Sequence, residues 1–222
     1  MMRVVTAYLH GVWHAYREGG VRLVARKAAS RLSCEVVLYA FELDRDVPAV
    51  ASELALEVRV LSPDDVGSYM ALRRDEDAGA VHARLRRGDL CFASWSGERM
   101  VGDVWVRFDR MWVSEFGKSF PLHAGEAYGY ASFIDPEHRR RGAASVLYEA
   151  AMRHVEGLGY RRMVVYVLRA NVPGRAALHR LRFVPIGRVR WFHVGRFGLE
   201  LNARDGTRPH LQVHVRPRDA HE

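Results

Sequence analysis

Residues 133–144 read Phe-Ile-Asp-Pro-Glu-His-Arg-Arg-Arg-Gly-Ala-Ala, and this stretch gives the strongest indication of the fold. The apolar residues at its start predict a strand over 128–134, and the small residues at its end predict a helix from Gly142. A helix start has unpaired N–H groups at the positive end of the helix dipole, so it binds anions. Because Gly142 and Ala144 are small and three arginines stand beside them, the stretch predicts a site for a diphosphate-bearing cofactor.

The patterns on either side predict an antiparallel meander followed by a β-α-β-α-β segment. This order indicates an α/β (α+β) domain with a mixed, mostly antiparallel central sheet flanked by helices. The meander consists of strands over 35–43, 56–61, 90–95 and 100–108, a helix that begins at Ser62, a helix over 75–87, and a long connection over 109–125. The second part continues after the strand over 128–134 with a helix over 142–157, a strand over 161–168, a helix over 173–182, and strands over 183–189 and 191–199.

Three regions follow from this reading. Residues 1–50 form an N-terminal extension with a basic helix and a strand, and 51–201 form the main domain. Residues 202–222 are polar and rich in arginine and proline, which predicts a flexible tail. The helix over 12–32 has a weak apolar stripe and five basic residues, so it either packs on the domain or lies on an anionic membrane surface.

Composition indicates a soluble cytoplasmic protein. Of the 222 residues, 49% are apolar, which is enough for a core. The first residues lack the apolar segment of a secretion signal, and no apolar run approaches the length of a membrane span. The two cysteines, Cys34 and Cys91, lie far apart without metal-ligand spacing, so we expect neither a disulfide nor a metal site.

The net charge of +8 is concentrated in the second half of the chain. Residues 137–222 hold 17 arginines and 7 acidic residues, whereas residues 1–136 hold 17 basic and 19 acidic residues. Nucleic acid and a polyanionic small molecule both fit this excess. The arginines beside a helix start favour the small molecule, and no nucleic-acid-binding motif is present.

Residues 134–144 resemble the acyl-CoA signature of the GNAT superfamily of N-acyltransferases. The family pattern R/Q-x-x-G-x-G/A falls on Arg139, Gly142 and Ala144. Residues 171–183 are similar to the family's second segment, which runs from an asparagine through a short helix to a Gly-Phe. The resemblance covers roughly residues 56–200 and implies a GNAT-like sheet with splayed central strands.

The resemblance also implies roles for individual residues. The main chain of Phe133 and Ile134 would pair with the pantetheine amides of the cofactor. The main chain of the next segment would hold the pyrophosphate, and this segment comprises Arg139, Arg140, Arg141, Gly142, Ala143 and Ala144. Asn171 would touch the pantetheine arm or order the splayed strands, with a plain helix cap as the alternative.

Two positions depart from the family pattern. Leu178 stands where the family often has a tyrosine that protonates the departing thiolate, and Arg182 replaces the glycine of the Gly-Phe. Leu178 cannot donate a proton, but a thiol with a pKa near ~8.5 leaves readily as a thiolate.

An amine that attacks a thioester must also lose a proton, and a carboxylate or water would accept it. Glu126, at the start of the strand that ends at Ile134, is the candidate base, with a structural glutamate as the alternative. Tyr128 lies on the same face two residues later and would donate a hydrogen bond or line the acceptor site, or serve as an ordinary sheet aromatic.

These features together predict an N-acyltransferase that moves an acetyl group from acetyl-CoA to a primary amine of a small-molecule or carrier-bound acceptor. Two alternatives stay open: a long-chain N-acyltransferase that uses acyl-CoA or acyl carrier protein, and a non-catalytic acyl-CoA-binding module. The sequence also leaves open whether the chain forms a homodimer.

Overall fold

The computed structural model describes residues 33–44, 54–114, 117–194, 197–204 and 210–215, with side chains described over 34–44, 54–114 and 117–191. The chain divides into two compact units, Val37–Ile186, and Met1–Val36 together with Gly187–Glu222. All of the predicted site residues fall in the first of these. The predicted basic helix over 12–32 lies outside the described residues. Within the described part of the chain, no helix is both long enough and apolar enough to cross a membrane.

The larger unit is built on a sheet in which the strand order is β1-β8-β7-β4-β3-β2. Pairing is antiparallel from β2 through β3 and β4 to β7, and parallel between β7 and β8. The predicted mixed, mostly antiparallel sheet is therefore confirmed. Its strands are β1 (Ser33–Glu42), β2 (Glu57–Val60), β3 (Leu90–Ser96), β4 (Arg99–Arg107), β7 (Glu126–Ile134) and β8 (Arg162–Leu168).

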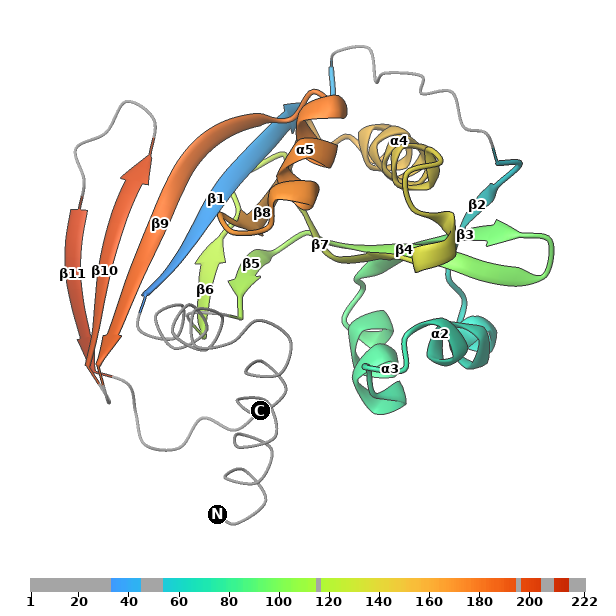
Figure 1. The fold of residues 1–222 in the computed structure, drawn as a ribbon, viewed down its shortest axis with the longest axis horizontal. Coiled ribbons are helices and arrows are strands. Elements are labelled where there is room, and N and C mark those ends of the chain that lie inside the picture. The colour runs from blue at the N-terminus through green and yellow to red at the C-terminus, as the bar shows by residue number, and fades with distance from the viewer. Residues whose placement is uncertain (1–32, 45–53, 115–116, 195–196, 205–209, 216–222) are drawn as a thin grey trace, which may run out of the picture. The chain divides into compact units, whose positions relative to one another are not determined.

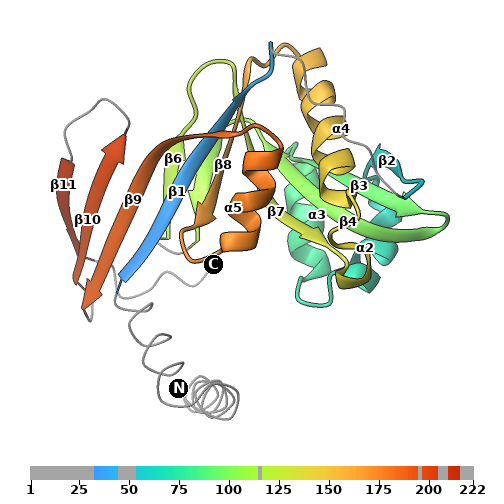
Figure 2. The same cartoon turned by 45° about the horizontal axis from the view of Figure 1, so that its top comes forward.

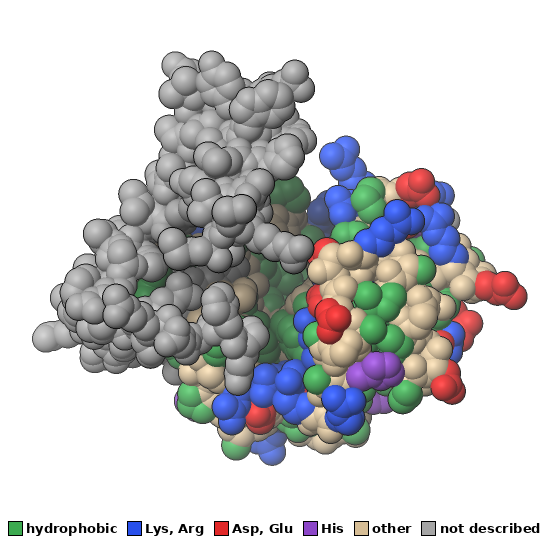
Figure 3. Space-filling model, turned by 90° about the horizontal axis from the view of Figure 1, so that it is seen from below, with side chains coloured by type: hydrophobic (Ala, Val, Ile, Leu, Met, Phe, Trp, Pro, Cys, Tyr) green, Lys and Arg blue, Asp and Glu red, His purple; other side chains and the backbone are tan. Residues whose placement is uncertain are grey.

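Helices cover both faces of this sheet (Figures 1 and 2). On one face lies α4 (Ala143–Gly157), which connects β7 to the parallel strand β8 and buries Leu147, Met152 and Val155. On the other lie α2 (Val66–Leu72) and α3 (Ala78–Arg86), whose buried side chains pack with Trp105 of β4. A short helix, α5 (Val172–Arg180), follows β8. Figure 3 shows the α2–α3 face, where basic and acidic side chains are interspersed.

The start of α2 illustrates how local sequence fixes an element. Ser62 precedes a short 3₁₀ turn, Pro63–Asp65, that leads into the helix. The Asp65 carboxylate accepts hydrogen bonds from the Ser62 main-chain N–H at 2.9 Å and from the Ser62 hydroxyl at 2.7 Å. This is the helix start that the Ser-Pro-Asp-Asp sequence predicts.

The predicted long connection over 109–125 is only partly a connection. It contains a small hairpin formed by β5 (Arg110–Val113) and β6 (Lys118–Pro121), which pair antiparallel in a sheet of their own. The strands have four residues each, and a segment this short shows little periodicity in the sequence.

In the smaller unit, β9 (Val184–Val194), β10 (Phe197–Arg204) and β11 (His210–Val215) pair antiparallel in that order. Two expectations differ here. β9 is continuous where the sequence predicted separate strands over 183–189 and 191–199. The expected tail from 202 contains β11, in which Leu211, Val213 and Val215 alternate with polar residues. An alternation of only three apolar residues is a weak signal for a strand, and arginines and prolines flank it in the sequence. The strand conformation is stabilised by pairing with β10.

Candidate functional site

The central strands β7 and β8 part where the sequence places the candidate site. Their parallel pairing covers only Glu126–Gly129 against Arg162–Val165. β7 then continues to Ile134 while it pairs with β4 on its other side, through Phe133 with Asp103 and Ile134 with Gly102. The last five residues of β7 therefore have an edge that β8 does not pair with, and main-chain groups on such an edge are available to an extended ligand.

A bulge interrupts the pairing of this stretch of β7 with β4. Trp105 of β4 pairs with Tyr130 and Asp103 pairs with Phe133, so the register of β4 leaves out both Ala131 and Ser132. Ala131 has a φ of +49°. The left-handed conformation costs a non-glycine residue roughly 1–2 kcal/mol, so it is kept only where contacts with the surrounding structure stabilise it.

The loop after β7 is held by its own side chains. Asp135 begins a 3₁₀ turn, Pro136–His138, and its carboxylate accepts from the Glu137 N–H at 3.0 Å. The Arg99 guanidinium of β4 donates to the other Asp135 oxygen at 2.6 Å. Arg140 has a φ of +63°, so the chain turns sharply as it approaches the helix.

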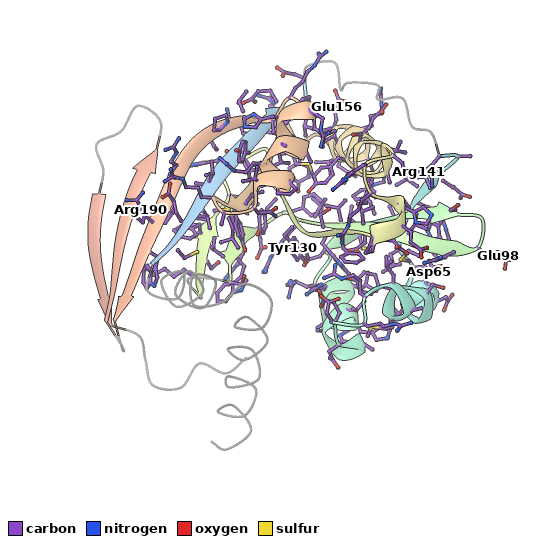
Figure 4. The ribbon with its side chains drawn as sticks, viewed as in Figure 1. Asp65, Glu98, Tyr130, Arg141, Glu156 and Arg190 are labelled. Carbon is purple, nitrogen blue, oxygen red and sulfur yellow. The ribbon has the colours of Figure 1, made fainter. Side chains whose placement is uncertain are left out.

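The N-terminus of α4 has no side-chain cap. Its N-cap residue is Gly142, with a φ of +88°. The first main-chain hydrogen bonds of the helix run from the Ser145 and Val146 N–H groups to the Gly142 carbonyl. The N–H groups of Ala143 and Ala144 therefore precede the hydrogen-bonded ladder, at the positive end of the dipole of a 15-residue helix. This geometry fits a diphosphate, and Figure 4 shows Arg141 beside it.

The predicted pantetheine-binding residues lie at the end of β7. Two guanidinium groups lie close to the Phe133 ring, that of Arg73 at 5.1 Å from its centroid and that of Arg139 at 5.6 Å. The Ile134 carbonyl accepts a hydrogen bond from Arg139 Nε at 2.9 Å. Arg139 therefore binds the strand that leads to the loop, and a pantetheine amide that pairs with this carbonyl would share it with the guanidinium.

Glu126 lies at the opposite end of β7. It is buried, one carboxylate oxygen accepts from the His123 N–H at 3.0 Å, and the other pairs with Arg162 at 3.3 Å. Ile134 lies eight positions further along the strand, which is about 26 Å at ~3.3 Å per residue. These contacts are those of a residue that holds the start of β7 to β8.

Tyr128 is also buried and engaged. Its hydroxyl donates to the Trp112 carbonyl at 3.0 Å. Its ring stacks with those of Tyr130 and Tyr166, whose centroids are 5.4 and 6.1 Å away. Tyr128 therefore links a neighbour on its own strand to Tyr166 on β8.

The second family segment forms the helix α5. The Asn171 side-chain oxygen accepts from the Gly174 N–H at 3.0 Å and so caps that helix. Leu178 is 4% exposed and packs in the main core with Leu181 and Phe183. A proton donor is therefore replaced by a core residue at the position where the family often has tyrosine.

A buried charged cluster that the sequence did not predict contacts β7. Asp103 is fully buried in β4, and Arg73, at the end of α2, pairs with it at 3.2 Å. Burial raises the pKa of Asp103 to about 7, while the positive charge of Arg73 opposes that rise. The Tyr130 hydroxyl donates to Asp89 at 2.5 Å, and burial raises the pKa of this hydroxyl. The signal in the sequence was an aspartate inside the apolar strand 100–108.

A cavity of about 410 Å³ opens between α2 and the end of β7. Phe133 lines it, so this residue borders both the cavity and the parted edge of β7. Charges of both signs reach it. The lining residues are Ser68, Ala71, Leu72, Arg74, Glu98, Arg99, Met100, Phe133, Asp135 and Pro136.

Comparisons with known proteins agree with this geometry. Residues 57–183, more than half of the chain, match the family described as the acetyltransferase (GNAT) family. A mycothiol acetyltransferase from Geodermatophilus obscurus is 28% identical over 92 residues, which are 41% of this chain and 28% of that relative. The match thus spans less than a third of the relative's length.

Two solved structures share the fold. A GCN5-related N-acetyltransferase from Sphaerobacter thermophilus has a TM-score of 0.52 and 14% identity, over 77% of this chain and 55% of its own. A GNAT-family protein from Novosphingobium aromaticivorans has a TM-score of 0.52 and 15% identity, over 71% of this chain and 62% of its own. The family match, the parted strands and the uncapped helix agree, and the chain belongs to the GNAT family of acetyltransferases.

Proposed function

We propose that this protein transfers an acetyl group from acetyl-CoA to a primary amine of a small-molecule or carrier-bound acceptor. The observation that carries the proposal is the uncapped N-terminus of α4, placed directly after a strand that has parted from its neighbour. The helix start would bind the diphosphate of CoA through the main chain of residues 139–144. The free edge of β7 would bind the pantetheine arm and bring the thioester to the bulge.

The acceptor would reach the thioester from the cavity between α2 and β7. Phe133 supports this assignment, because its side chain lines the cavity and its main chain belongs to the parted strand. Arg74 would meet an acidic group of the acceptor, and Glu98 would meet its amine.

The chemistry needs little from acid–base residues. The nitrogen lone pair attacks the carbonyl carbon, a C–N bond forms, and the oxyanion is stabilised by main-chain N–H groups at the bulge. The oxyanion then collapses, the C–S bond breaks, and its electron pair leaves with sulfur as a thiolate. We infer that water accepts the amine proton, because both oxygens of Glu126 are engaged. A buried Leu178 is compatible with this route, since the thiolate can leave unprotonated at neutral pH.

A second candidate function is acyl-CoA binding without turnover. It is favoured by Leu178, whose place in the core removes the proton donor that the family often has. The long-chain alternative, with acyl-CoA or acyl carrier protein as donor, would use the same strand edge for the pantetheine arm and differs in the acyl group and, for acyl carrier protein, in the carrier.

One set of measurements tests these functions. Native mass spectrometry of the purified protein should detect a bound CoA species and give the mass of its acyl group. Calorimetry should then show binding of acetyl-CoA, and a thiol-release assay against a panel of amines should show turnover. Binding without turnover on any amine would favour the binding module, and a wild-type protein that binds no CoA thioester would refute the proposed function.

A further inference from the structure

Arg73 is a buried arginine whose contacts extend beyond those of a structural ion pair. It follows α2 as its C-cap residue and is 7% exposed. Its guanidinium binds Asp75 with two hydrogen bonds of 3.1 and 3.2 Å, and Glu76 with one of 3.1 Å. The remaining nitrogen, Nη1, points into the protein and contacts both oxygens of Asp103 at 3.2 and 3.3 Å.

The same nitrogen also reaches the bulge of β7. Nη1 donates to the Ala131 carbonyl at 3.0 Å. Ala131 is the residue with the positive φ, and it lies in the two-residue gap in the register with β4. The guanidinium also lies 5.1 Å from the Phe133 ring, so Arg73 contacts β7 on both sides of Ser132.

Asp103 explains why this arginine keeps one orientation. It is fully buried in β4 and pairs in register with Phe133, directly beside the bulge. A buried ion pair contributes little net stability, because desolvation offsets the attraction between the charges, and apolar residues of the same size are often as stable. Stability alone therefore gives little reason for charge at this point in the sheet.

We propose that Arg73 is a positioning residue, held by Asp103, that fixes the strained main chain of Ala131–Phe133 in the orientation that meets the thioester carbonyl of the acyl donor. The inference depends on the proposed function, because it assigns a donor to the bulge. Arg73 itself does not touch the donor. It acts by preventing Ala131 from relaxing out of the left-handed region, which would turn the adjacent N–H groups away.

The test is isotope-edited infrared spectroscopy of [1-¹³C]acetyl-CoA bound to the protein. Hydrogen bonds to the carbonyl lower its stretching frequency, so wild-type protein should shift that band downward. The test variant is the double exchange Arg73→Met/Asp103→Leu, which replaces the ion pair by apolar side chains and leaves no lone buried charge. We expect it to lose at least half of the wild-type shift, while its dissociation constant for CoA changes less than threefold.

Arg84→Met is the matched control. Arg84 binds the same Glu76 at 3.0 Å and lies 5.2 Å from the Trp105 ring, but the bonds described for it reach no main-chain atom of β7. This variant should keep the full shift. Arg73→Lys retains the positive charge but replaces the planar guanidinium by one ammonium group, which cannot make all of the same hydrogen bonds. It should give an intermediate shift.

Each result decides the matter. An unchanged shift in the double variant, or a wild-type protein that binds acetyl-CoA without any shift, would overturn the positioning role and leave the proposed function intact. A wild-type protein that does not bind acetyl-CoA would overturn both. A shift that Arg84→Met also loses would show a general effect of removing an arginine that binds Glu76, and would count against a specific role for Arg73.

Discussion

Gly142 is the residue on which the diphosphate assignment rests most directly, since it starts α4 with a φ of +88° and no side-chain cap. We predict that Gly142→Glu reduces CoA affinity at least 100-fold. A glutamate there would place bulk and negative charge at the anion-binding N–H groups, in a conformation that costs roughly 1–2 kcal/mol. Calorimetric titration with CoA measures the effect.

Gly88 provides the control for strain. It too has a φ of +88°, and a Cβ added there would meet no atom within 4 Å. Gly88→Glu therefore carries the same conformational cost and the same charge, far from the loop in sequence. It should lower the melting temperature by a similar amount and bind CoA as the wild type does. Equal affinities in the two variants would remove the helix start from the proposed site.

Glu126 permits a second test with a single residue. We predict that Glu126→Gln keeps the acetyl-transfer rate within threefold of wild type, because the carboxylate is engaged at the far end of β7 from the bulge. The amide retains an acceptor for the His123 N–H but loses the ion pair with Arg162, so a stability loss of about 1 kcal/mol is expected. Steady-state rates and urea unfolding of the same samples measure both. A rate loss of 100-fold or more with the fold intact would restore Glu126 as the base.

At the scale of elements, what the sequence predicted depended on how local the signal was. The strand-to-helix stretch 133–144 was predicted closely, because a proline, a glycine and the apolar run before them define it within twelve residues. The antiparallel neighbours β3 and β4 were also predicted, over 90–95 and 100–108, from patterns that are equally local. The β5–β6 hairpin and β11 were not, since short strands obtain their conformation from a partner that the local pattern does not show.

The charged cluster could not be predicted for a similar reason. Arg73 and Asp103 are 30 residues apart, and only the packing of α2 on β4 brings them together. An aspartate between apolar neighbours in a strand signals a buried partner, but it does not say which of the many arginines in this chain that partner is.

The start of the helix α5 is fixed by a single side chain. Asn171 caps it by accepting from the Gly174 N–H. We predict that Asn171→Ala lowers the free energy of unfolding by about 1 kcal/mol, whereas Asn171→Asp, which keeps the accepting oxygen, leaves it within ~0.5 kcal/mol. Both variants should bind CoA within threefold of wild type. If affinity fell tenfold in Asn171→Asp while stability stayed constant, Asn171 would contact the pantetheine arm as well.

At the scale of the whole molecule, the buried cluster makes folding depend on pH. Asp103 faces Arg73, Glu76 and Arg84, and burial raises its pKa from 3.8 to about 7. Between about pH 4 and pH 7 the unfolded chain releases this proton while the folded chain keeps it. The free energy of unfolding therefore falls as pH rises through that window, and the contribution is fully present only below pH 4.

We predict that the stability of Asp103→Asn improves relative to wild type between pH 5 and pH 8, by on the order of 1–3 kcal/mol, because the asparagine has no proton to release. Urea unfolding of both proteins across that range measures the difference. Asp75→Asn is the control, since Asp75 binds the same Arg73 at 3.1 Å but has a lowered pKa, so its contribution is lost only as pH falls below about 4. Its difference from wild type should stay constant from pH 5 to pH 8. If the difference in stability between Asp103→Asn and wild type were also constant from pH 5 to pH 8, the prediction would be wrong. Arg73 would then keep Asp103 ionised over the whole range.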